Sequence, residues 1–130
     1  MSVTFAVDDT PYKDEILNEG TDDAFICSTP VEPFIDINLS STNARMFLEV
    51  FGIDSDELCG KISVEQAKSI GDKMKRRLED SDFSGLLRET VKDGNFTFIG
   101  TDREYVLTRV SQFLTLFTLA IEHNKDIHYA

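Results

Sequence analysis

The sequence has few of the residues on which common catalytic and metal sites depend. Its 130 residues include two histidines and two cysteines, and Cys27 and Cys59 form neither a C-x-x-C motif nor a pair with metal-ligand spacing. It also lacks a glycine-rich phosphate loop and the G-x-S-x-G and H-E-x-x-H motifs. We therefore expect no metal, no cofactor and no recognisable catalytic centre.

The small number of cysteines also bears on the compartment. A chain of about 130 residues can build a sufficient core without crosslinks, so two isolated cysteines indicate buried, reduced thiols of a cytoplasmic protein. A disulfide between Cys27 and Cys59 is also compatible with the sequence. The first residues, MSVTFAVDD, lack the basic and apolar regions of a secretory signal. No apolar run is long enough to cross a bilayer, so we expect no membrane partner.

Basic residues are scarce as well. Thirteen lysines and arginines stand against 24 acids, which gives a net charge of −11. Binding to a nucleic-acid backbone needs a basic face, so nucleic acid is not an expected partner. An acidic chain suits a basic protein partner instead, and the plainer interpretation is that the charge serves solubility.

The charge is unevenly distributed along the chain. Residues 8–23 hold seven acids and one lysine, which is −6 of the total −11. One basic cluster, Lys73, Lys75, Arg76 and Arg77, falls at the end of a predicted helix, where cations stabilise the helix dipole. The acidic segment is therefore the surface most suited to a basic partner, and its plainer interpretation is a solvated loop.

Hydrophobic periodicity predicts a single α+β domain over residues 1–130. We expect a small mixed or antiparallel sheet of three to five strands packed against three or four helices. The expected strands are 3–7, 24–28, 34–39 and 127–130, and the expected helices are 42–51, 63–79, 83–91 and 103–124. We further expect a loop or short hairpin connection at 8–23, a helical turn at 54–58, and a short strand or extended connector at 96–99.

The predicted strand 34–39 suggests a second candidate surface. Its alternation places Asp36 and Asn38 on the face opposite the apolar residues. If the short final strand pairs with it, His128 would lie nearby, and a carboxylate beside a histidine is the minimum for acid–base chemistry. The plainer interpretation is a solvated outer face with a cross-strand charge pair.

Three functional hypotheses follow from these features. The leading one is a non-enzymatic interaction protein, of the inhibitor, immunity or adaptor type, which binds a basic protein partner. Its binding residues would be Asp14, Glu15, Asp22 and Asp23. The second is a small ligand-binding protein or enzyme with a polar site near Asp36, Asn38 and His128. The third is a structural homo-oligomer assembled through the long apolar C-terminal helix, 103–124.

Overall fold

The fold is built on one four-stranded sheet. The computed structural model describes the backbone of residues 1–130 and every side chain except those of Phe96 and Phe98. Strands β1 (Ser2–Val7), β4 (Asp36–Ser40), β5 (Gly60–Ile62) and β8 (Ile127–Tyr129) pair in the order β4-β1-β8-β5. Every pairing in this sheet is antiparallel. The α+β prediction is confirmed. Of the two expected forms of the sheet, mixed and antiparallel, the structure has the antiparallel one.

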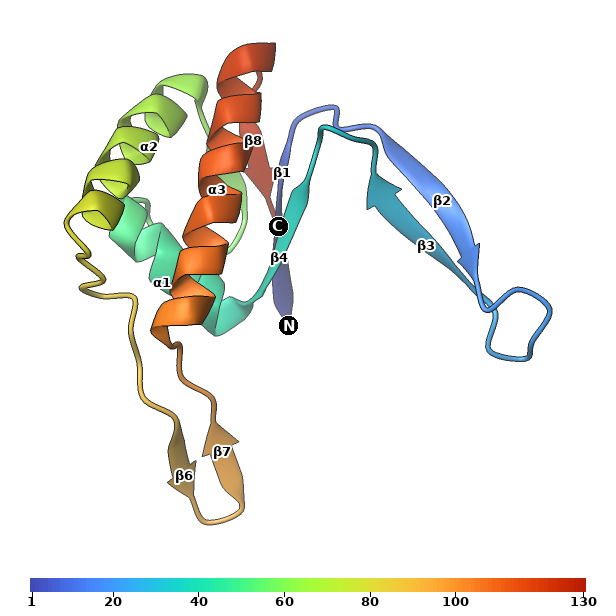
Figure 1. Cartoon of the computed structure of the whole chain (residues 1–130), viewed down its shortest axis with the longest axis horizontal. Coiled ribbons are helices and arrows are strands. Elements are labelled where there is room, and N and C mark those ends of the chain that lie inside the picture. Colours follow the sequence, from blue (N-terminus) through green and yellow to red (C-terminus); the bar gives the residue numbers. More distant parts are fainter.

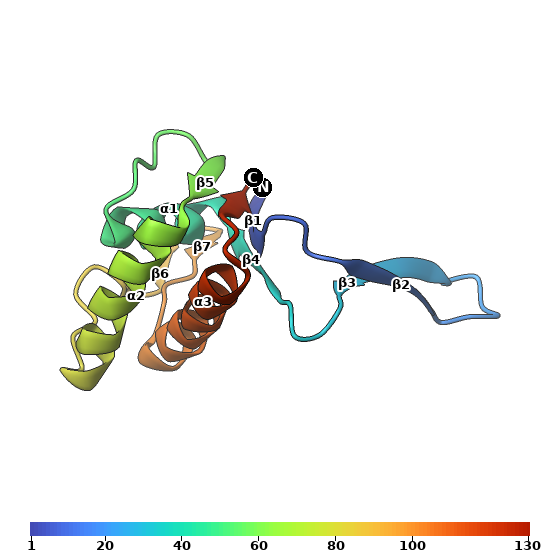
Figure 2. The same cartoon turned by 90° about the horizontal axis from the view of Figure 1, so that it is seen from above.

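Three helices pack on one side of this sheet, as Figures 1 and 2 show from two directions. They are α1 (Ser41–Phe51), α2 (Val64–Glu79) and α3 (Arg103–His123). Their limits follow from local capping chemistry. The Ser40 hydroxyl accepts the first-turn N–H of α1, and α1 ends at Gly52, whose φ of 78° is left-handed. Ser63 and Gln66 form a capping box at the start of α2, and Asp102 caps α3.

A cluster of phenylalanines joins the helices to the sheet. The ring of Phe113, on α3, lies 5.1 Å from the rings of Phe5, Phe47 and Phe51, measured between centroids. Phe5 comes from the centre of β1, and its ring also stacks on Tyr129 at 5.2 Å. The core therefore lies between the inner face of the sheet and α3, and the other face of the sheet is turned away from the helices.

Two hairpins extend from this body. The first joins β2 (Tyr12–Leu17) to β3 (Phe25–Pro30), and the second joins β6 (Val91–Asp93) to β7 (Phe96–Phe98). Figure 1 shows the β2–β3 hairpin projecting from the side of the sheet opposite the helices. The acidic segment, predicted to be a loop or a short hairpin connection, is thus largely the first strand and the tip of this hairpin.

Several expectations about single elements are wrong. The helix predicted at 83–91 does not form: Gly85 has a φ of 80°, and the backbone of Arg88 instead pairs with Thr101 through two hydrogen bonds. Residues 54–58 form no helical turn, and the three-residue strand β5 follows them. The final strand β8 does not pair with β4, because β1 lies between the two.

The cysteines also differ from expectation. Both are free, but Cys59 is exposed and Cys27 is only partly buried. Cys27 lies on β3, in the hairpin that projects from the body, so the core does not cover its thiol. The prediction of buried thiols is therefore wrong for both residues.

Candidate functional site

The projecting hairpin β2–β3, residues 12–30, carries an unusual amount of exposed apolar surface. We call it the arm. Ile16, Phe25 and Ile26 are 57%, 51% and 68% exposed, and Tyr12 and Leu17 are exposed as well. The buried core of the described residues includes nothing from the arm. Two-stranded hairpins are only marginally stable alone, so a ribbon that leaves its apolar side chains uncovered is typical of an interaction element.

The pairing register gives both faces of the arm an apolar pair. Ile16 is paired with Ile26 on one face, and Leu17 with Phe25 on the other. Paired residues of antiparallel strands point to the same side, and successive residues point to opposite sides. A partner could therefore contact apolar side chains on either face of the arm near its tip.

The four predicted binding carboxylates all belong to the arm. Asp14 and Glu15 lie on β2, beside the apolar pairs and on opposite faces, while Asp22 and Asp23 lie in the turn that joins the strands. The hydroxyl of Ser28 donates a hydrogen bond to Asp14, and Lys13 lies 3.7 Å from the carboxylate of Glu15. The arm contains five acids and one lysine, a net charge of −4.

The outer face of the sheet holds the second predicted group, but its members do not meet. Asp36 and His128 both pair with Ala6, so they lie on the same face with β1 between them. Two strand spacings amount to about 9 to 10 Å, too far for a hydrogen bond. Asn38 instead donates to Thr4 at 2.8 Å. The described cavities are not lined by any of these three predicted residues.

His128 has a different carboxylate partner, Asp8, which follows β1. The Nδ1 atom of His128 lies 2.8 Å from Oδ1 of Asp8, while Nζ of Lys61 donates to Oδ2 at 2.9 Å. The hydrogen bond from Lys61 is the main cause that holds the pKa of Asp8 below its usual value, and that of Lys61 is raised in return. This network joins the middle residues of β5 and β8 to the residue that follows β1.

Asp36 contacts the root of the arm. The phenol of Tyr12 donates to Oδ2 of Asp36 at 3.2 Å. Partial burial raises the pKa of Tyr12, and the negative charge of Asp36 adds to the effect, so the phenol keeps its proton and remains a donor. This bond helps to fix the direction in which the arm leaves the sheet.

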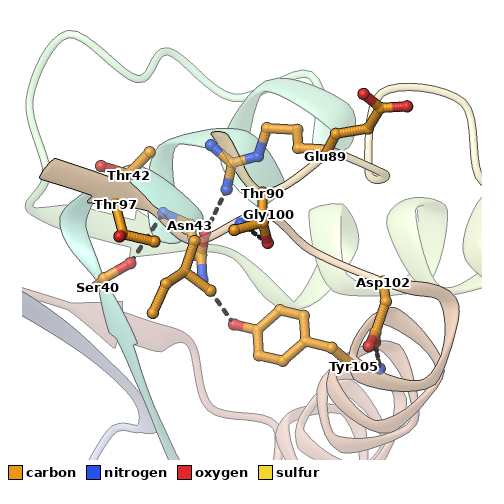
Figure 3. Close-up of a pocket in the computed structure, with 11 residues that line it drawn as sticks. Ser40, Thr42, Asn43, Glu89, Thr90, Thr97, Gly100, Asp102 and Tyr105 are labelled. Atoms are coloured by element: carbon orange, nitrogen blue, oxygen red, sulfur yellow. Dashed lines mark hydrogen bonds between the residues drawn. The ribbon is translucent and has the colours of Figure 1, made fainter. Parts of the chain in front are cut away.

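A third surface, which the sequence did not indicate, is a cavity of about 1000 Å³ beside the β6–β7 hairpin. Figure 3 shows its side chains, which come from the start of α1, the two ends of that hairpin and the start of α3. Arg88 donates to Oδ1 of Asn43, and Nδ2 of Asn43 donates to the Tyr105 hydroxyl at 3.0 Å. The Nε atom of Arg88 is buried and has no hydrogen-bond partner among the described atoms.

One residue of this cavity, Asn43, could be placed from the sequence, whereas Arg88 could not. The expected helix 42–51 agrees closely with α1 and therefore placed Asn43 in its first turn. Arg88 was assigned to a helix that does not form, so its place beside Asn43 could not be foreseen. Their contact spans 45 residues and depends on the backbone bridge between Arg88 and Thr101.

Comparison with protein-family models, curated proteins and solved structures finds no match to this chain. Within the described residues, no helix has the length and apolar character needed to span a membrane. The same residues contain no group of three or more His, Cys, Asp or Glu side chains placed to hold a metal ion.

Proposed function

We propose that this chain is a non-enzymatic interaction protein, of the inhibitor, immunity or adaptor type, whose arm binds a basic protein partner. The observation that carries the proposal is the combination of uncovered apolar pairs and carboxylates on an element held away from the body. Stable interfaces have an apolar centre surrounded by a polar rim. On the arm, the pair Ile16 and Ile26 would form that centre on one face, and the pair Leu17 and Phe25 would form it on the other.

The acids give the proposed contact its selectivity. With a net charge of −4, the arm is repelled by acidic surfaces and by a second arm, and is attracted to a basic groove. Opposite charges across an interface mainly accelerate association and exclude wrong partners, while buried apolar contacts slow dissociation. The matching partner surface is therefore an apolar groove with lysines or arginines along its edges.

The first experiment is site-specific photo-crosslinking in host cells. A photoreactive residue at Ile26 is expected to crosslink one protein reproducibly, with the attachment point near basic residues. The same probe at Glu57, an exposed position on the body, serves as the matched control. Equal capture from both positions, or none from Ile26, would contradict the proposal.

The second experiment measures the affinity for the crosslinked protein after charge reversal. Replacing Asp14 and Glu15, or Asp22 and Asp23, with lysines is expected to lower the affinity about tenfold or more at low salt, mainly through slower association. Replacing Asp56 and Glu57 with lysines makes the same change in net charge on the body. If that control weakens binding equally, the effect is one of total charge and the arm is not the binding element.

A further inference from the structure

The cavity beside the β6–β7 hairpin lies apart from the arm, and its lining includes one basic side chain, that of Arg88. An arginine guanidinium has five N–H donors and no acceptor. For Arg88, the hydrogen bond recorded among the described residues is the one from Nη2 to Asn43, while its buried Nε is unpaired. This nitrogen is shielded from water-sized groups, so the guanidinium N–H groups that remain for a ligand in the cavity are those of Nη1 and Nη2.

Asn43 fixes a second donor at the same cavity. Its Oδ1 accepts from Arg88 and its Nδ2 donates to the oxygen of Tyr105. Because that oxygen already accepts a bond from Asn43, the hydroxyl proton of Tyr105 is left to point elsewhere. Asn43 thus holds the guanidinium of Arg88 and the hydroxyl of Tyr105, which belong to two other parts of the chain, and both residues line the same cavity. Such a fixed arrangement lowers the entropic cost of ligand binding.

The acids of the cavity do not cancel these donors. Asp102 accepts the backbone N–H of Tyr105 at 2.8 Å, so its charge is compensated by the start of α3. Figure 3 shows the carboxylate of Glu89 directed away from Asn43 and Tyr105. The guanidinium of Arg109 also lies over the Tyr105 ring, 5.4 Å from its centroid, and adds positive charge behind it.

We propose that this cavity binds a small anionic molecule through the oxygens of a carboxylate or phosphate group. Arg88 and Tyr105 contact the anion, and Asn43 acts as the positioning residue. Arginine suits both groups because its N–H donors match two oxygens of one anion. The charge must come from Arg88 locally, since the whole chain carries −11 and repels anions at longer range. This site is independent of the arm, so the failure of either proposal leaves the other intact.

The test is an NMR titration of the full-length chain in phosphate-free buffer, with inorganic phosphate in one series and succinate in another. We expect saturable shifts of the amides of Arg88, Gly100 and Tyr105. Saturation by phosphate alone identifies a phosphate-bearing ligand, and saturation by succinate alone identifies a carboxylate. Saturation by both supports recognition of the shared charge. Linear shifts in both series would overturn the proposal.

Variants separate this site from general charge effects. Arg88→Gln is expected to weaken binding at least tenfold, whereas Arg76→Gln, which removes the same charge from exposed α2 surface, leaves it within twofold. Tyr105→Phe removes only the hydroxyl and is expected to weaken binding several-fold while keeping the folded spectrum, even if Arg88→Gln does not fold. Unchanged affinity in Tyr105→Phe together with a folded, fully binding Arg88→Gln would refute the assignment, as would equal losses in Arg88→Gln and Arg76→Gln.

Discussion

At the scale of single residues, Asp8 links more of the sheet than any of the predicted site residues. Its carboxylate contacts Lys61 of β5 and His128 of β8, and its backbone N–H donates to Asp126 at 2.8 Å. The side chain is only 25% exposed, so these bonds are partly shielded from water. The histidine chosen from the sequence is therefore better explained as part of this network than as an acid–base group.

This network predicts a pH-dependent loss of stability in Asp8→Asn. Because the folded-state pKa of Asp8 lies below the ordinary 3.8, its contribution is complete above 3.8 and is lost as pH falls through the lowered value. We expect Asp8→Asn to reduce the free energy of unfolding by about 1 kcal/mol at pH 5 and by less at pH 2.5. Urea unfolding at both pH values measures the difference.

A neighbouring carboxylate gives the control for this prediction. The Oδ2 atom of Asp9 lies 2.6 Å from Nζ of Lys125, but the side chain of Asp9 is 79% exposed. Asp9→Asn is therefore expected to change the free energy of unfolding much less than Asp8→Asn at either pH. An equal loss for Asp8→Asn at pH 5 and pH 2.5 would show that packing, rather than the charge of Asp8, is responsible.

At the scale of elements, local signals and long-range pairing differ in how far they can be predicted. The capping box at Ser63 and the helix stop at Gly52 depend on residues three or four apart, so the limits of α1 and α2 were predicted closely. The strand β5 has three residues and depends on pairing with β8, some 67 positions later. No local pattern encodes such a contact, and the partner of β8 was wrongly predicted for the same reason.

Whether the arm contributes to the stability of the body can be tested directly. None of its residues belongs to the buried core, so replacing residues 14–28 with the two-residue turn Asn-Gly should leave the body folded. The replacement keeps Tyr12, and with it the hydrogen bond to Asp36. We expect the melting temperature, measured by circular dichroism, to change by only a few degrees.

A core variant sets the scale for that measurement. Phe113→Ala removes the ring that contacts Phe5, Phe47 and Phe51, and is expected to cost about 3 to 5 kcal/mol. If shortening the arm destabilises the chain as much as Phe113→Ala does, the arm contributes to folding and its exposed residues need no partner to explain them. If the shortened chain keeps its stability, it also serves as the control without an arm in the affinity measurements.

At the scale of the whole molecule, the net charge and the exposed apolar surface have opposite effects on self-association. The net charge of −11 opposes contact between the uncovered arms of different molecules at neutral pH, and the sequence isoelectric point is about 4.5. The long helix α3 also exposes apolar surface, since Leu107 is 38% exposed. Self-association could therefore cover apolar surface either on the arm or on α3. Lowering the pH reduces the repulsion between molecules and allows whichever contact is favourable to form.

We expect sedimentation velocity to show monomers at pH 7.5 and reversible self-association near pH 4.5, where the net charge of the whole chain is close to zero and the repulsion between molecules is weakest. Replacing Ile16 and Ile26 with threonine should abolish the association at pH 4.5, because it removes the apolar pair from one face of the arm. The matched variant Leu107→Thr changes α3 and should leave the association unaltered. If Leu107→Thr abolishes it and the arm variant does not, α3 is the contact surface. A monomer at both pH values would show that the arm's apolar pairs are too small to associate without a complementary groove, and would leave the basic partner as the surface that covers them.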